Sequence, residues 1–239
     1  MNEVVAAPRE FTESGGSNGL RALLFDLDGT LIDTAPDIAL ALDRTLRSLG
    51  RPRADPARVR GWIGDGARAL LDKALGEAST DAQWDHFAFE YGAACGEASR
   101  LYPGVMTVLD RLGAAGIKLA VVTNKEARFA HRLLVKHGIS AYFDVLVAGD
   151  SLPLKKPNPA GVHRALDALQ VEPGDAALVG DSAIDLRTAR AAGVQAWLVT
   201  YGYGAGDLGT ADRPDHAIDD FSDLDPSRIG AGAARVTIT

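Results

Sequence analysis

The sequence has little of what stabilises secreted or membrane proteins. Only one of its 239 residues is cysteine, Cys95, so no disulfide can form within the chain. Small residues surround Cys95, and we expect it to be a buried thiol packed in a helix rather than a nucleophile. No apolar run approaches the roughly 20 residues needed to cross a bilayer. The sequence therefore predicts a protein with no membrane partner.

The first residues also lack the basic start and apolar stretch of a signal peptide. They are rich in Gly, Ser and Glu, so we expect residues 1–19 to form a flexible tail and the protein to be cytoplasmic. The net charge is -7, and no run is rich in Lys or Arg, which predicts no nucleic-acid partner. An anionic substrate would need a locally positive pocket. The sequence leaves the oligomeric state open.

Apolar runs and helical segments alternate along most of the chain. The first run, Arg21–Asp26, contains four consecutive apolar residues and predicts a buried strand. Further strands are predicted at 117–123, 145–148, 176–180 and 194–200, and the helices between them at 105–115, 126–137, 159–169 and 183–192. This alternation predicts an α/β fold with a doubly wound, parallel sheet.

A helical block interrupts that alternation early in the chain. One helix is predicted from Pro36 to Ser48 with Thr34 as its N-cap, and others at 59–63, 68–75 and 82–100. No strand is expected in this block. We therefore predict a helical cap at residues 35–101, inserted into a core made of residues 20–34 and 102–239.

Polar residues stand where several predicted strands end. Asp26, Thr123 and Asp181 each lie at or just beyond a strand end, and Lys156 lies in the loop beyond another. In parallel sheets the ligand binds at the carboxyl ends of the strands. Taken alone, each of these residues could simply cap a turn or face solvent. The ordered set predicts that one crevice collects all four.

The acidic residues in this set indicate a metal site. Asp26 and Asp28 are two positions apart in an extended segment, so their side chains point to the same side and repel each other. Mg²⁺, a hard cation that prefers oxygen ligands, fits this arrangement best. Asp181 would supply another oxygen, and Asp185, one helical turn later, would bind a metal-bound water or orient Lys156.

The remaining residues of the set suit a phosphate group. The Thr123 hydroxyl and the Asn124 backbone and amide groups stand at a predicted helix N-terminus, which favours anions. Lys156 would offset the charge that develops on phosphoryl oxygens.

The motifs around these residues resemble those of the haloacid dehalogenase superfamily. They are Asp26-Leu27-Asp28-Gly29-Thr30, Val121-Val122-Thr123-Asn124-Lys125, Lys156-Pro157-Asn158-Pro159 and Gly180-Asp181-Ser182-Ala183-Ile184-Asp185. The resemblance implies a Rossmann-like core with a helical cap, and a Mg²⁺-dependent phosphatase that forms an aspartyl-phosphate. It makes Asp26 the nucleophile, Asp28 the general acid and base, and Lys156 a catalytic cation. Mg²⁺ would be held by Asp26, Asp28, Asp181 and Asp185, and Gly29 and Thr30 would contact the substrate.

Within the superfamily the chain is similar to bacterial phosphoglycolate phosphatases. This similarity rests on residues 60–66, 101–105 and 200–204. It implies that the substrate is a small phosphorylated metabolite, 2-phosphoglycolate, with Gly64 and Arg68 as substrate contacts from the cap. Asp65 departs from the Asn often found there, and a carboxylate pointing inward would repel an anionic substrate.

Other functions remain open at this stage. Another sugar or nucleotide monophosphate could be the substrate, and a phosphomutase would share the nucleophile and the acid. A phospho-aspartate receiver is a more distant alternative, since receivers are half as long and have no cap. Asp28 argues against a dehalogenase, which has no leaving alkoxide to protonate.

Overall fold

The computed structural model describes residues 19–224, and its centre is a six-stranded parallel sheet. The strands lie in the order β5-β4-β1-β6-β7-β8. Their bounds are β1 Ala22–Phe25, β4 Lys118–Val122, β5 Val145–Val147, β6 Ala176–Gly180, β7 Gln195–Val199 and β8 His216–Ile218. The sequence-based prediction of a doubly wound α/β sheet is confirmed.

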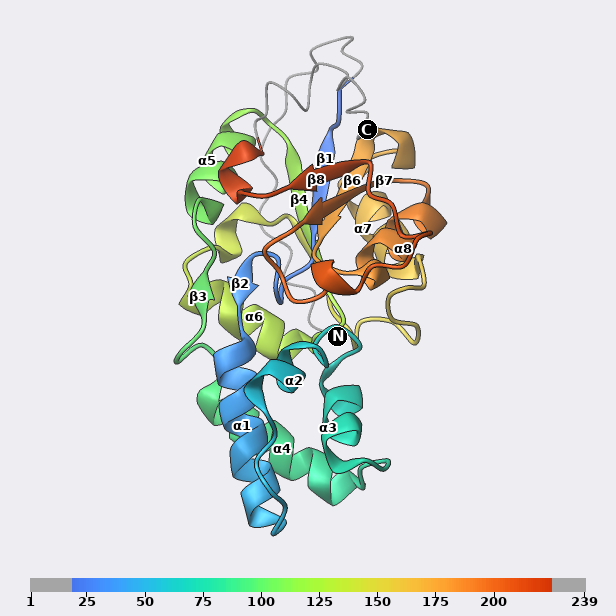
Figure 1. The fold of residues 1–239 in the computed structure, drawn as a ribbon. Coiled ribbons are helices and arrows are strands. Elements are labelled where there is room, and N and C mark those ends of the chain that lie inside the picture. Colours follow the sequence, from blue (N-terminus) through green and yellow to red (C-terminus); the bar gives the residue numbers. More distant parts are fainter. Residues whose placement is uncertain (1–18, 225–239) are drawn as a thin grey trace.

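Helices cover both faces of this sheet (Figure 1). Alternate residues of β1 show how the faces divide. Leu23 and Phe25 join an apolar cluster with α5 (Val105–Ala114) and α6 (Ala127–Lys136). Ala22 and Leu24 join another cluster with α7 (Ala160–Leu169) and α8 (Ala183–Ala192). Burial on both faces explains why the strands are apolar throughout.

The inserted helices form a separate group below the sheet in Figure 1. They are α1 Ala35–Ser48, α2 Pro56–Arg60, α3 Ala67–Leu75 and α4 Asp81–Ala94. Buried residues of α1 and α4, such as Leu42 and Phe87, belong to the same apolar cluster as α5 and α6. None of the described helices is long and apolar enough to cross a membrane.

Three details of the predicted elements were wrong. The helix predicted at 82–100 ends at Ala94, because Gly96 has a φ of 88° that a helix does not allow. The segment beyond it contains a strand, β3 (Arg100–Leu101), which pairs with β2 (Ile32–Asp33) where the cap joins the core. Strand β8 was not predicted, since its three residues, His-Ala-Ile, lie between aspartates and do not form an apolar run. Residues 1–18 of the tail predicted at 1–19, and the end of the predicted core beyond 224, lie outside the described residues.

A buried carboxylate fastens the two connections between the cap and the core. Asp37, in the first turn of α1, is fully buried, and its oxygens accept hydrogen bonds from the backbone N–H groups of Gly96, Ala98 and Ser99 at 2.7, 2.7 and 3.2 Å. The chain therefore leaves and re-enters the core side by side.

Replacing Asp37 with Ala should destabilise the fold, because three backbone donors would lose their acceptor. We expect the Asp37→Ala variant to lower the free energy of unfolding by about 2–4 kcal/mol in urea denaturation. Asp43→Ala on the same helix is the matched control, since its ion pairs with Arg47 and Arg53 reach into solvent and should contribute less than about 1 kcal/mol. Equal losses in both variants would contradict this role for Asp37.

Candidate active site

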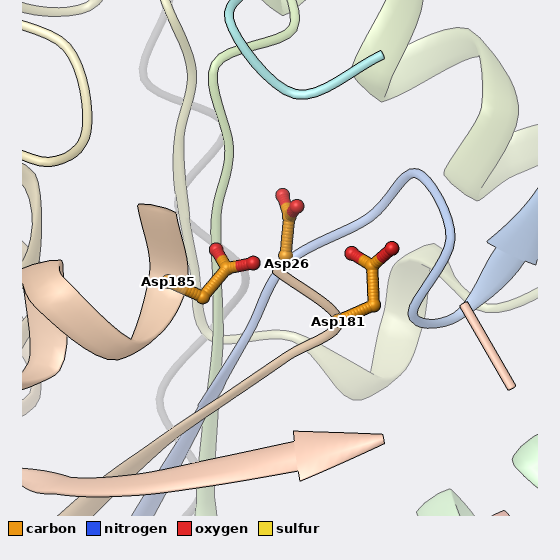
Figure 2. Close-up of side chains that lie close together, drawn as sticks. All are labelled: Asp26, Asp181 and Asp185. Carbon is orange, nitrogen blue, oxygen red and sulfur yellow. The ribbon is translucent and has the colours of Figure 1, made fainter. Parts of the chain in front are cut away.

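Three aspartates gather at the carboxyl ends of the central strands. Asp26 follows β1, Asp181 follows β6, and Asp185 lies in the first turn of α8. A carboxylate oxygen of each lies within 4.8 Å of those of the others, and all three residues are buried. Figure 2 shows Asp26 between the other two. The parallel register that pairs Phe25 with Val179 places Asp26 and Asp181 next to each other.

Burial and mutual repulsion disfavour the charged forms of two of these groups. Burial first, then the charges of Asp185 and Asp28, raise the pKa of Asp26 to about 6, against the opposing effect of Lys156. Burial and the charges of Asp185 and Asp26 raise the pKa of Asp181 to about 8. The positive charge around these carboxylates is too small to offset their negative charge. A bound divalent cation would supply the missing positive charge.

The donor set fits Mg²⁺. Its oxygens are hard ligands of the type Mg²⁺ prefers. Asp26 Oδ1 is buried, and its one described polar neighbour is the ammonium of Lys156 at 2.9 Å, so the oxygen has lone-pair capacity left. It is therefore available to a ligand.

Asp185 has less capacity for a metal than Asp26. Its Oδ1 accepts from Lys156 Nζ at 2.6 Å, and its Oδ2 accepts from the backbone N–H and the hydroxyl of Ser182 at 3.1 and 2.6 Å. These contacts suit the orientation of Lys156, one of the two roles expected from the sequence.

Glycine is required beside Asp181. A Cβ on Gly29, whose φ is 82°, would lie 2.4 Å from Asp181 Oδ2, and one on Gly202 would lie 2.1 Å from Asp181 Cβ. Thr30 donates to Asp181 Oδ1 at 3.4 Å. Gly29 and Thr30 thus border the acidic group. The substrate contacts expected of them from the sequence stay a prediction.

Lys156 reaches the same cluster from the loop after β5. Its side chain is 4% exposed and lies between Asp26 and Asp185. Burial lowers the pKa of Lys156, but the two carboxylates outweigh that effect and raise it. Thr123, which follows β4, is also buried, and its oxygen accepts from the backbone N–H of Lys125 at 3.3 Å.

The Asn124 side chain is fully engaged in holding loops together. Its Oδ1 accepts from the backbone N–H of Lys156 at 2.8 Å, and its Nδ2 donates to the carbonyls of Lys156 and Gly64 at 3.1 and 2.9 Å. Asn124 therefore joins the second and third motifs to the cap. This leaves its backbone, rather than its amide, for the phosphate contact expected from the sequence.

Asp28 has surroundings that the sequence did not suggest. Lys125 Nζ lies 2.9 and 2.8 Å from its two oxygens, and Thr34 donates to its Oδ1 at 2.6 Å. The general acid and base expected from the sequence would act as a protonated carboxyl group, whereas the geometry is that of a salt bridge with Lys125. Thr34, expected to cap α1 with its side chain, bonds Asp28 instead. Lys125 was missed as a site residue, and its only sequence signal was its position directly after Thr123-Asn124.

A pocket between core and cap opens onto these groups. Asp26, Asp28, Thr123 and Lys125 line it from the core, and Gly64 is among the residues that line it from the cap. Arg68, predicted as a substrate contact, does not line this pocket. It binds the carboxylate of Asp81 at 2.7 Å and the carbonyl of Ser79 at 3.1 Å.

Two further residues, Asp65 in the cap and Tyr203 in the core, have their polar groups paired. The Asp65 carboxylate pairs with Lys73 at 2.6 Å on the surface of the cap, so it is not the inward-pointing charge that would repel a substrate. The Tyr203 hydroxyl accepts from the backbone N–H groups of Thr34 and Ala35 at 2.7 and 2.9 Å, and its own backbone N–H donates to Asp181 Oδ2 at 2.6 Å.

Comparison with known proteins accords with this geometry. The model of the haloacid dehalogenase-like hydrolases matches residues 23–199. The chain belongs to this family. It is 40% identical over 215 residues to phosphoglycolate phosphatase 1 of Pseudomonas aeruginosa, covering 86% of this chain and 79% of that protein. It is 36% identical to phosphoglycolate phosphatase of Vibrio parahaemolyticus, covering 86% of this chain and 94% of that one.

A solved structure supports the same relationship. The crystal structure of a predicted phosphoglycolate phosphatase from Haemophilus somnus superimposes with a TM-score of 0.78 at 34% identity, covering 88% of this chain and 98% of that one. The chain is thus a phosphatase, an enzyme that hydrolyses phosphoric monoesters.

Because the pKa values of Asp26 and Asp181 lie above the ordinary value of 3.8, the metal-free fold binds protons that the unfolded chain releases. Its stability should therefore fall as the pH rises from about 4 to 8. We expect saturating Mg²⁺ to raise the melting temperature by about 5–10 °C at pH 8 and by less at pH 5, measured by calorimetry at constant ionic strength. An equal rise at both pH values, or an undiminished rise in Asp181→Asn, would contradict a metal site here.

Proposed function

We propose that this phosphatase hydrolyses 2-phosphoglycolate to glycolate and phosphate, with Mg²⁺ as cofactor and Asp26 as the nucleophile. The observation that carries the proposal is the placement of Asp26 and Asp28 on one pocket beneath the cap. One carboxylate can attack phosphorus while the other serves the leaving group. The substrate is inferred from the phosphoglycolate phosphatases that the chain resembles along nearly its whole described length.

In the first half of the reaction an Asp26 oxygen attacks phosphorus, and the bond from phosphorus to the ester oxygen breaks. The product on the enzyme is an aspartyl-phosphate. Asp28 gives a proton to the departing alkoxide, which leaves as the alcohol. The proton that Asp28 gives is supplied by solvent before the ester bond breaks; in the structure the Asp28 carboxylate contacts Lys125.

In the second half, water attacks the aspartyl-phosphate. Asp28 takes a proton from that water, and phosphate leaves as Asp26 is restored. Throughout, the Thr123 hydroxyl and the Lys156 ammonium bind the phosphoryl oxygens, and Asp185 orients Lys156. Mg²⁺, held by Asp26, Asp181 and the backbone carbonyl of Asp28, would supply the charge that lets a carboxylate approach a phosphate.

Loss of the nucleophile should abolish turnover. We expect Asp26→Asn to lower phosphate release from 2-phosphoglycolate by at least about 10³-fold, measured with Mg²⁺ beside a panel of sugar and nucleotide monophosphates. The variant should stay folded, because it removes one of three repelling carboxylates.

The panel separates the parts of this proposal. Highest wild-type activity on another ester would keep the nucleophile and overturn the substrate. Transfer of the phosphoryl group to a sugar faster than release of phosphate would indicate a phosphomutase. Full activity of Asp26→Asn would overturn the mechanism.

Loss of the general acid should depend on the leaving group. We expect Asp28→Asn to slow hydrolysis of alkyl phosphates by about 10²–10⁴-fold, because an alkoxide needs a proton to leave. Formation of the aspartyl-phosphate from p-nitrophenyl phosphate, whose phenolate leaves unaided, should be slowed much less in a rapid-mixing burst. Equal effects on the two esters would exclude Asp28 as the acid.

A further inference from the structure

The mechanism above gives no substrate contact to Lys125, although Lys125 lines the pocket. Its side chain is only 4% exposed. Two contacts hold it there: the Asp28 carboxylate, and the ring of Tyr91, whose centroid lies 4.9 Å from Nζ. An ammonium group has three N–H donors, and the oxygens of Asp28 can occupy two. One donor of a buried, charged group therefore remains for a ligand.

Lys125 stands where the leaving group must lie. Asp28 has to be within hydrogen-bonding reach of the ester oxygen to protonate it. Since Lys125 Nζ is 2.8 Å from Asp28 Oδ2, the ammonium would lie within about 6 Å of the ester oxygen that Asp28 protonates. A substituent two bonds from the ester oxygen falls within this space.

The cap side of the pocket is mostly apolar. Its wall there is formed by the side chains of Ile38, Ile63, Ala67, Leu70 and Phe87, together with Gly64, Gly66 and Tyr91, whose hydroxyl is buried without a hydrogen-bond partner. A polyhydroxylated leaving group would need several acceptors and donors here, because each unpaired hydroxyl has a cost on burial. A small leaving group with one anionic group matches a single ammonium among apolar side chains.

Two other cations near the site, Arg68 of the cap and Lys156 of the core, are paired with carboxylates elsewhere. Arg68 is paired with Asp81 and does not line the pocket. Lys156 is held by Asp26 and Asp185 on the phosphoryl side.

We propose that Lys125 is a specificity-determining residue that binds a carboxylate on the leaving group, one carbon from the ester oxygen. This inference rests on the proposed function and names the contact that would select its substrate. The Tyr91 ring and Asp28 hold the ammonium in place, and the apolar wall excludes water from the ion pair.

The test compares 2-phosphoglycolate with its neutral amide, phosphoglycolamide, which has nearly the same shape. Both leaving groups are alkoxides that need a proton from Asp28, so the ratio of their kcat/KM values isolates recognition of the carboxylate. We expect wild type to prefer the acid, and Lys125→Met to reduce that preference by about 10- to 100-fold, chiefly by raising KM for the acid. Lys125→Arg should restore part of it.

The matched control is Arg68→Met, which removes a cap cation outside the pocket and should leave the ratio unchanged. A wild-type preference that persists in Lys125→Met would overturn the role of Lys125 while leaving the substrate proposal intact. Loss of the preference in Arg68→Met instead would restore the assignment made from sequence. A wild type that never prefers the acid would overturn both proposals. If Lys125→Met loses turnover, its binding of the product glycolate can still be compared with that of wild type by calorimetry.

Discussion

Repulsion among three buried carboxylates is the constraint around which the active site is built. The parallel sheet brings Asp26 and Asp181 to adjacent strand ends, and α8 adds Asp185. The single Lys156 ammonium between them balances only part of the charge. The backbone N–H groups of Tyr203 and Gly204 stabilise Asp181 without adding a full charge. The remaining deficit favours a divalent cation and an anionic substrate bound together, rather than either alone.

A second pair of opposite charges, Asp28 and Lys125, lies next to this acidic cluster. Asp28 lies beside this acidic cluster but is paired with its own cation, Lys125. The site is thus divided into a phosphoryl side around Lys156 and a leaving-group side around Lys125. Each side has one buried ammonium, so an anion finds a local cationic partner in a protein with a net charge of -7.

The sequence predicted those parts of the site that local patterns describe. Apolar runs marked β1, β4, β5, β6 and β7, and polar residues at their ends marked Asp26, Thr123 and Asp181, because strand ends in a parallel sheet converge. It did not predict which cation lines the pocket. Arg68 and Lys125 are 57 positions apart, and only the packing of the cap on the core decides which of them lines the pocket. The short strands β3 and β8 were missed because Arg100–Leu101 and His216–Ile218 form no apolar run, whereas the equally short β5 consists of Val145, Leu146 and Val147.

Tyr203 has a consequence for how this protein could have diversified. Its hydroxyl accepts a hydrogen bond from the backbone N–H of Thr34, where the cap helix α1 begins, and its backbone N–H donates to Asp181 of the acidic cluster. Tyr203 nevertheless lies 169 positions after Thr34 in the sequence. A cap transplanted from a relative would therefore arrive without the residue that seats its first helix. Its first helix would be seated only where the recipient core offers an acceptor, such as a tyrosine hydroxyl, at this position.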